Sequence, residues 1–149
     1  MPQSLVKIYV HLVFATKYRT DMLRKVDLPR IHAYMACTLS AAGCVPIVVG
    51  GTENHVHALF VHNKNAILPD VVRDVKRTTS RWIKSIDAWY DNFMWQEGYG
   101  AFSLGRSSVE AATNYINNQE EHHRRLTYTD ELRMLCERYD VPFDERYED

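Results

Sequence analysis

The sequence has little of what marks secreted, membrane or disulfide-rich proteins. Its 149 residues include three cysteines, Cys37, Cys44 and Cys136, and no two of them form a CxxC pair. The first residues lack the basic region and apolar run of a signal peptide, and no apolar run approaches membrane-spanning length. An odd number of cysteines without a secretion signal indicates reduced thiols, so we expect a cytoplasmic protein.

A strong net charge is also absent, because the formal charge is −1. Residues 129–149 hold eight acidic but only three basic residues, which leaves an excess of basic residues in 1–128. An acidic tail at about 140–149 therefore offsets a mildly basic body. A local basic surface, and not the overall charge, is what attracts a phosphate backbone. With 46% hydrophobic residues, the chain predicts one domain over 1–149 with a sizeable core.

Hydrophobic periodicity predicts an α+β domain with the order β-α-β-β-α-β-α-α. The first six elements match the ferredoxin-like split βαβ arrangement, a four-stranded antiparallel sheet with two helices on one face and additional C-terminal helices beyond it. We expect strands over 4–16, 44–51 and 99–104 and in the segment around His55, and helices over about 28–42, 68–86, 107–123 and 130–139.

Three residues give helix start and stop signals. Asp27 is a candidate N-cap before Pro29, and Gly43 is a plausible C′ residue for the same helix. Ser107, with Glu110 three residues later, predicts a capping box at the start of the third helix.

The pair His55 and His57 is the most informative feature of the chain. Side chains two apart on a strand point to the same face, so the two imidazoles project together while Val56 points the other way, into the core. Imidazole pairs bind divalent metals, and a bound metal polarises a phosphate or carbonyl oxygen. A chance pairing in a half-buried strand is the alternative.

The helix predicted over 107–123 carries a second polar cluster. Tyr115 and Gln119 are four residues apart and share one helix face. The alternatives are an interfacial tyrosine and a solvated glutamine. His122 and His123 are adjacent on the helix, so at most one of them joins a site, and we expect both at the surface near the helix C-terminus.

Basic residues in three places are candidates for DNA contact, with a solvated surface as the alternative. Two of them leave the first strand, one precedes the third helix, and the others follow a three-to-four spacing along the second helix. In chain order they are Lys17, Arg19, Arg73, Lys76, Arg77, Arg81, Lys84 and Arg106.

Taken together, these segments resemble the HUH-type single-tyrosine transposases of bacterial insertion sequences, which include the REP-associated tyrosine transposases. The resemblance covers nearly the whole chain. Five pieces carry it in the right order: residues 11–19 (HLVFATKYR), 54–57 (NHVH), 76–82 (KRTTSRW), 95–103 (WQEGYGAFS) and 115–123 (YINNQEEHH).

The resemblance implies a role for each motif residue. His55 and His57 match the family's metal ligands, Gln119 its third ligand and Tyr115 its nucleophile. Asn54 stands where the family commonly has Asp. The implied cofactor is Mg²⁺ or Mn²⁺, and the implied reaction cleaves and rejoins single-stranded DNA through a 5′-phosphotyrosine intermediate.

The resemblance further implies DNA hairpins as partners and a homodimer with composite active sites. Two other functions stay open at this point. One is a domesticated, non-catalytic protein that binds DNA hairpins on the same fold. The other is a metal-storage or zinc-regulatory module unrelated to DNA.

Overall fold

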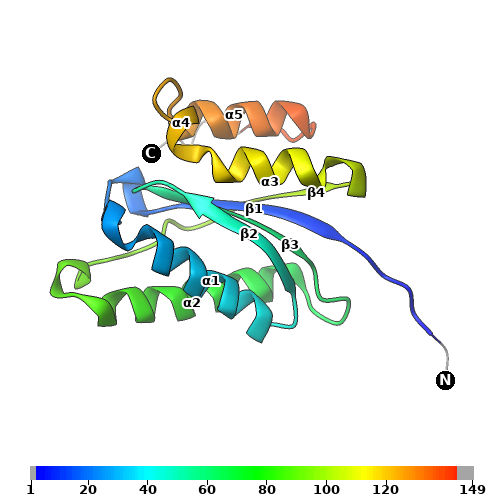
Figure 1. Cartoon of the computed structure of the whole chain (residues 1–149), viewed down its shortest axis with the longest axis horizontal. Helices are drawn as coiled ribbons and strands as arrows, with labels where there is room; N and C mark the ends of the chain where they lie inside the picture. The colour runs from blue at the N-terminus through cyan, green and yellow to red at the C-terminus, as the bar shows by residue number, and fades with distance from the viewer. Residues whose placement is uncertain (1–2, 144–149) are drawn as a thin grey trace.

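The protein, described here over residues 3–143 by a computed structural model, places one sheet between two layers of helices (Figure 1). The strands are β1 (Tyr9–Ala15), β2 (Val45–Gly51), β3 (His55–Val61) and β4 (Gly100–Leu104). The helices are α1 (Leu28–Ala41), α2 (Leu68–Ile86), α3 (Val109–Asn117), α4 (Gln119–His122) and α5 (Tyr128–Arg138). The 3₁₀ turns are η1 (Lys17–Arg19), η2 (Lys25–Asp27), η3 (Ala88–Tyr90) and η4 (Arg106–Ser108). Within the described range, every helix is too short or too polar to cross a membrane.

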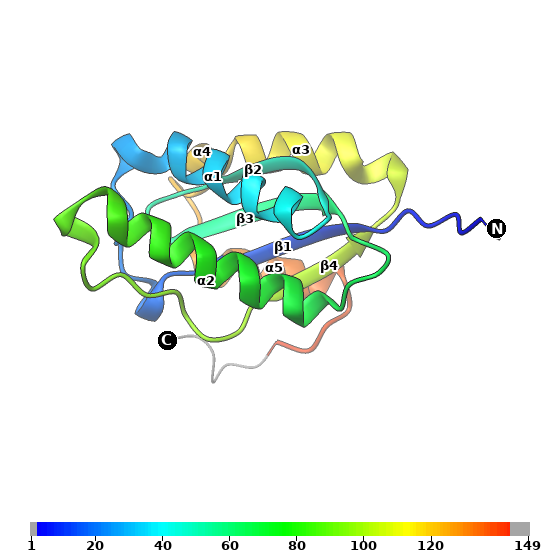
Figure 2. The ribbon, with the colours of Figure 1, turned by 90° about the horizontal axis from the view of Figure 1, so that it is seen from below.

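The sheet has the order β2-β3-β1-β4, and all three strand pairs are antiparallel. This confirms the expected ferredoxin-like core, with β1 and β3 in the middle. Helices α1 and α2 cover one face, as Figure 2 shows, while α3, α4 and α5 cover the other. Ala15 of β1 lies opposite His55 of β3, and Val13 lies opposite His57, so the histidines occupy the end of β3 where β1 exits the sheet.

Strand alternation divides the interior into two cores. Leu12, Phe14 and Val56 belong to the larger core, against α1 and α2. Val13 and Ala15 belong to the smaller core against α5, which also contains Phe102, Tyr128, Leu135 and Cys136. Because β1 and β3 are buried on both faces, their two-residue period decides which side chains enter each layer.

Several predicted boundaries were wrong in detail. Strand β1 begins at Tyr9 and not at residue 4, and the preceding Leu5 and Ile8 are exposed. Ser107 lies in η4, and α3 begins at Val109 without a side-chain cap. The helix expected over 107–123 is interrupted at Asn118, which separates α3 from α4.

Of the two signals expected at the ends of the first helix, Gly43 is confirmed and Asp27 was wrong. Gly43 has a φ of +81° after α1, as a C′ glycine should. Asp27 precedes α1 but caps no backbone group, because its carboxylate accepts hydrogen bonds from Arg24, Arg30 and Tyr90. Most of the acidic tail, residues 144–149, lies outside the described residues.

Gly50 lets helix α3 approach the sheet. A Cβ atom at Gly50 would lie 2.6 Å from the backbone oxygen of Ile116 and 2.9 Å from its Cγ2. Backbone at such a distance cannot rotate away as a flexible side chain does. Because Gly50 has no side chain, α3 can pack at a short distance from the sheet. This distance also determines where the neighbouring Tyr115 lies.

We expect Gly50→Ala to lower the free energy of unfolding by about 1–3 kcal/mol, because α3 must shift to admit the methyl group. Denaturant unfolding measures this change. Gly105→Ala is the matched control, since a Cβ there meets nothing within 4 Å and its φ is −84°. Equal stability of the Gly50→Ala variant and the wild type would contradict this packing argument.

Candidate active site

His55 and His57 project from β3 toward α3, α4 and α5, as their spacing predicts. Both imidazoles are fully buried, and their ring centroids are 5.2 Å apart. Val56 between them packs into the core on the opposite face. The predicted geometry of this motif is therefore confirmed.

A carboxylate from α5 joins the two imidazoles. Oε1 of Glu131 lies 2.8 Å from Nε2 of His57 and 3.4 Å from Nε2 of His55. Glu131 is itself fully buried. One ligand atom from each of His55, His57 and Glu131 lies within 4.8 Å of the other two, which is a spacing suited to a single metal ion.

Gln119 completes this cluster from the start of α4. Its Oε1 lies 2.8 Å from Nε2 of His55 and 3.1 Å from Nε2 of His123. The side chain is 1% exposed, and its amide nitrogen has no hydrogen-bond partner among the described residues. The amide oxygen therefore points into the cluster.

Asn54 and Thr52 both contact the outer nitrogen of His55, Nδ1, and the Thr52 hydroxyl oxygen lies 3.0 Å from it. The Asn54 amide nitrogen donates to the backbone oxygen of Arg19 over 3.4 Å, and its oxygen lies 2.8 Å from Nδ1 of His55. With a proton on Nδ1, His55 donates to Asn54, because an amide oxygen only accepts. In that tautomer the lone pair of Nε2 faces the oxygens of Gln119 and Glu131; in the other tautomer Nε2 donates a hydrogen bond to these oxygens.

This donor set fits a divalent cation. With the proton of His55 on Nδ1, its Nε2 lone pair converges with the amide oxygen of Gln119 and a carboxylate oxygen of Glu131, an arrangement that a positive ion stabilises. The outer nitrogens of the ligands have their own partners: Asn54 for His55, and Nε2 of His11, at 2.7 Å, for Nδ1 of His57. Such outer partners orient metal-binding histidines.

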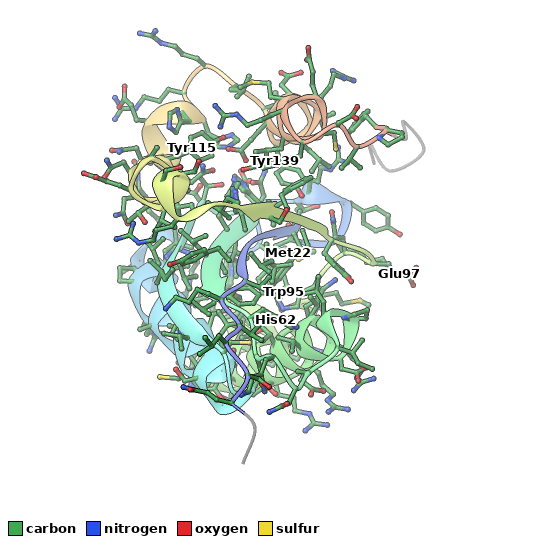
Figure 3. All side chains as sticks on the ribbon, turned by 90° about the vertical axis from the view of Figure 1, so that its right-hand side faces the viewer. Met22, His62, Trp95, Glu97, Tyr115 and Tyr139 are labelled. Carbon is green, nitrogen blue, oxygen red and sulfur yellow. The ribbon has the colours of Figure 1, made fainter. Side chains whose placement is uncertain are left out.

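Tyr115 lies at the edge of the same cluster, on the side of the sheet covered by α3–α5 (Figure 3). Its ring centroid is 5.9 Å from that of His57, and its hydroxyl donates a hydrogen bond to Oε2 of Glu131. The side chain is only partly buried. The structure thus brings together Tyr115, Gln119 and both histidines within one chain.

Burial and hydrogen bonding set the protonation of this site. Burial, followed by the hydrogen bond to Glu131, raises the pKa of Tyr115 above its usual value. Burial alone would raise the pKa of Glu131, but hydrogen bonds from His123, His55 and His57 hold it well below its usual range. Burial lowers the pKa of His57 despite the carboxylate. The phenol is therefore protonated and the carboxylate charged near neutral pH.

The prediction that at most one of His122 and His123 joins the site agrees with the structure, but the expected surface position was wrong for His123. Nε2 of His123 lies 3.3 Å from Oε1 of Glu131, and its ring centroid is 4.4 Å from that of His55. The ring of His122 lies 4.5 Å from the ring of Tyr115. Because the chain breaks helical geometry at Asn118, α4 turns both side chains toward the site.

The candidate DNA-binding residues lie in three separate places. Lys17 and Arg19 belong to η1, next to the site, and the Arg19 guanidinium lies 5.3 Å from the Tyr128 ring centroid. Arg106 belongs to η4, at the end of the sheet remote from His55. The others lie on α2, which covers the opposite face of the sheet from the site (Figure 1).

The residues on α2 differ in their surroundings. Arg73 and Arg77 form exposed ion pairs with Asp70 and Asp74. The Lys76 ammonium donates to the backbone oxygens of Gln96 and Gly98, and burial lowers its pKa. Arg81 and Lys84 are exposed, and no ion pair within residues 3–143 involves either of them.

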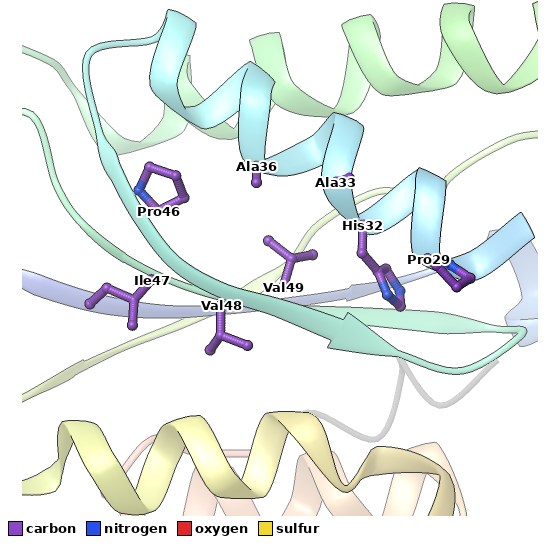
Figure 4. A pocket seen from close by; sticks show the side chains of 8 residues that line it. All are labelled: Pro29, His32, Ala33, Ala36, Pro46, Ile47, Val48 and Val49. Atoms are coloured by element: carbon purple, nitrogen blue, oxygen red, sulfur yellow. The ribbon is translucent and has the colours of Figure 1, made fainter.

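A groove of about 380 Å³ lies between α1 and β2 (Figure 4). Pro29, Ala33, Ala36 and four residues of β2 line it together with His32. Burial lowers the pKa of His32 to about 4, so the groove is uncharged near neutral pH. It therefore offers neither an anionic metal ligand nor a fixed charge for phosphate.

Glu131 is the functional residue that the sequence analysis missed. It lies 74 residues after His57 and in a different helix from Tyr115, so no local spacing joins it to either. The only sign of Glu131 in the sequence is its position four residues before Leu135, which puts its carboxylate on the apolar face of the helix. A buried acid at such a position requires partners, and the histidines supply them.

Comparisons with known proteins identify a family and similar folds. A family described as "Transposase IS200 like" matches residues 4–119, which includes the histidine pair, Tyr115 and Gln119 but not Glu131. A crystal structure from Deinococcus radiodurans, assigned as a transposase, superposes with a TM-score of 0.62 at 20% identity, covering 80% of this chain and 98% of that one. A REP-associated tyrosine transposase bound to a REP hairpin gives 0.60 at 10% identity, covering 83% and 73%. No curated protein matches the sequence.

We expect the free energy of unfolding to fall as the pH drops below about 6.5. Burial and then the charge of His57 lower the pKa of His11 to about 3, so between these values the unfolded chain binds a proton that the folded chain does not. His11 alone then contributes a slope of about 1.4 kcal/mol per pH unit. His11→Gln keeps a donor for His57 but does not titrate, so its slope should be smaller by that amount.

Denaturant unfolding of both proteins between pH 4.5 and 7.5 measures the two slopes. Parallel slopes for the His11→Gln variant and the wild type would show that His11 does not stay neutral in the folded protein.

Proposed function

The chain belongs to the IS200-like transposase family, and we propose that it cleaves and rejoins single-stranded DNA through a 5′-phosphotyrosine intermediate at Tyr115. The observation that carries this proposal is the convergence of the Tyr115 phenol, two buried imidazoles, an amide and a carboxylate on one side of the sheet. A phenol beside a candidate metal centre is the arrangement that a nucleophilic attack on a phosphodiester requires.

The proposed reaction conserves the energy of the phosphodiester bond. The Tyr115 oxygen forms a bond to phosphorus, the bond from phosphorus to the 3′ oxygen breaks, and the 3′ oxygen takes a proton from water and leaves as a 3′-OH. The phenol already donates to Glu131, so this carboxylate is the nearest acceptor for the phenolic proton. A 3′-OH of another strand reverses the step and joins the DNA, which hydrolysis by water would prevent.

We propose that His55, His57, Gln119 and Glu131 hold the divalent metal. A bound metal supplies charge withdrawal from the scissile phosphate. Two imidazoles with two oxygen ligands suit Mn²⁺, and the carboxylate makes the set more favourable for Mg²⁺ than imidazoles alone. Asn54 supplies an amide oxygen to His55 at the position where the family commonly has Asp.

For DNA contact we propose the same eight basic residues, in three groups. Lys17 and Arg19 lie beside the site and suit the strand that enters it. In the group on α2, Arg81 and Lys84 are exposed and form no ion pair within residues 3–143, whereas Arg73, Lys76 and Arg77 have partners. Arg106 stands apart at the far end of the sheet. The similar structure of a REP-associated tyrosine transposase is bound to a REP hairpin, which supports hairpin DNA as a partner.

Assembly and location complete the proposal. Contacts within one chain already bring Tyr115 to His57, so the described residues need no second copy to build the site. The homodimer with composite sites that the resemblance implies stays a prediction. We propose the cytoplasm as the location, since the substrate is DNA.

We expect Tyr115→Phe to abolish the covalent adduct with DNA while leaving hairpin binding intact, because only the attacking oxygen is removed. The assay incubates the protein with single-stranded DNA and Mg²⁺ or Mn²⁺ and resolves adducts on a denaturing gel. Tyr128→Phe is the matched control, since its ring lies 4.9 Å from that of His55, and it should still form the adduct.

An adduct with the Tyr115→Phe variant would overturn the assignment of the nucleophile. Metal-independent hairpin binding by the wild type, without any adduct, would instead favour a domesticated, non-catalytic protein.

We expect Asn54→Leu to weaken Mn²⁺ binding by about 10- to 100-fold, because His55 loses the acceptor that keeps its Nε2 lone pair turned inward. Asn54→Asp keeps an acceptor and should bind Mn²⁺ at least as tightly as the wild type. Calorimetric titration at neutral pH measures both. Unchanged affinity in the Asn54→Leu variant, with unfolding confirming an intact fold, would exclude this role for Asn54.

A further inference from the structure

The turn η1 holds two consecutive residues in the left-handed region. Tyr18 has a φ of 59° and Arg19 a φ of 55°, and neither is glycine. Each such residue costs roughly 1–2 kcal/mol, and strain of this kind persists only where surrounding contacts impose it. Strained turns are concentrated at functional sites, so η1 is a candidate functional segment.

The backbone on both sides of Tyr18 is firmly held. The Lys17 amide donates to Met94, and the Thr16 hydroxyl donates to the backbone oxygen of Thr20 over 2.6 Å. The Arg19 guanidinium donates to Thr129 of α5 and covers the Tyr128 ring. These contacts fix the turn without help from the Tyr18 side chain.

The Tyr18 ring itself is 72% exposed. The Lys17 ammonium lies 5.5 Å from its centroid, so a cation and an aromatic face are presented together. Asn54 connects this turn to the site, because it donates to the Arg19 oxygen and accepts from His55. The strained turn therefore displays a ring to solvent at a fixed place, and Arg19 and Asn54 connect it to the candidate metal ligand His55.

We propose that Tyr18 is a stacking platform for an unpaired base of the DNA strand that leads into the active site, with Lys17 contacting the adjoining phosphate. An aromatic face with a neighbouring cation is the chemistry that binds single-stranded nucleic acid, since every base has a π face. This inference rests on the proposed function and adds a contact that positions the strand.

The test compares two oligonucleotides, a blunt DNA hairpin and the same hairpin with a single-stranded oligo-dT extension of about ten nucleotides that contains one 2-aminopurine. Tyr18→Ala should bind the extended hairpin about 5- to 150-fold more weakly than the wild type and the blunt hairpin equally well. Tyr18→Trp should retain the preference for the extension. In the wild type, stacking should quench the 2-aminopurine fluorescence, and in Tyr18→Ala it should not.

Tyr18→Gly separates stacking from backbone strain. Glycine accepts a positive φ without penalty, so this variant keeps the turn but lacks the ring. It should lose the preference as Tyr18→Ala does. Recovery of the preference in Tyr18→Gly, or equal weakening on both oligonucleotides in Tyr18→Ala, would overturn the proposal. A wild-type adduct together with an unaffected Tyr18→Ala variant would reject the platform alone, whereas no adduct and no DNA binding by the wild type would reject the proposed function.

Discussion

The constraint on which this structure depends is the burial of two imidazoles in the middle of a sheet. A buried polar ring must have a hydrogen-bond partner or a metal, because an unsatisfied group there costs about 1–3 kcal/mol. His55 and His57 meet this requirement on both edges of each ring. Asn54 and His11 bind the outer nitrogens, and Gln119 and Glu131 face the inner ones. Helix α4 supplies one of these inner partners, Gln119, and α5 supplies the other, Glu131.

The sequence was sufficient to predict the parts of this site that depend on the residue period of a single strand or helix. A two-residue strand period placed both histidines on one face, and a four-residue helix period placed Tyr115 and Gln119 together. The element order gave the ferredoxin-like sheet, because short connections and antiparallel pairing leave few alternatives. The interruption of the third helix at Asn118 was not visible, since neither glycine nor proline marks it.

Glu131 could not be predicted for a different reason. Its contacts with His57 and Tyr115 are tertiary, and they depend on how α5 returns across the sheet after a loop. The same limit applies to Arg73, Arg77 and Lys76, which the helical period groups as one stripe. In the folded protein, acidic neighbours pair with the two arginines, and two backbone oxygens bind the lysine. Spacing identifies a shared face but not the partners that occupy it.

The carboxylate of Glu131 adds a buried negative charge to the site. Two neutral imidazoles and an amide would leave the full charge of a divalent ion available to a phosphate. In the proposed site, a buried carboxylate would neutralise part of that charge, so it would favour retention of the ion and reduce its pull on the phosphate. Burial raises the pKa of the Tyr115 phenol, and the same carboxylate raises it further by accepting a hydrogen bond from the phenol, so the phenol is protonated near neutral pH. In the proposed site, Glu131 of α5 would thus connect metal binding with the protonation of the nucleophile, because its two oxygens contact the two parts of the site.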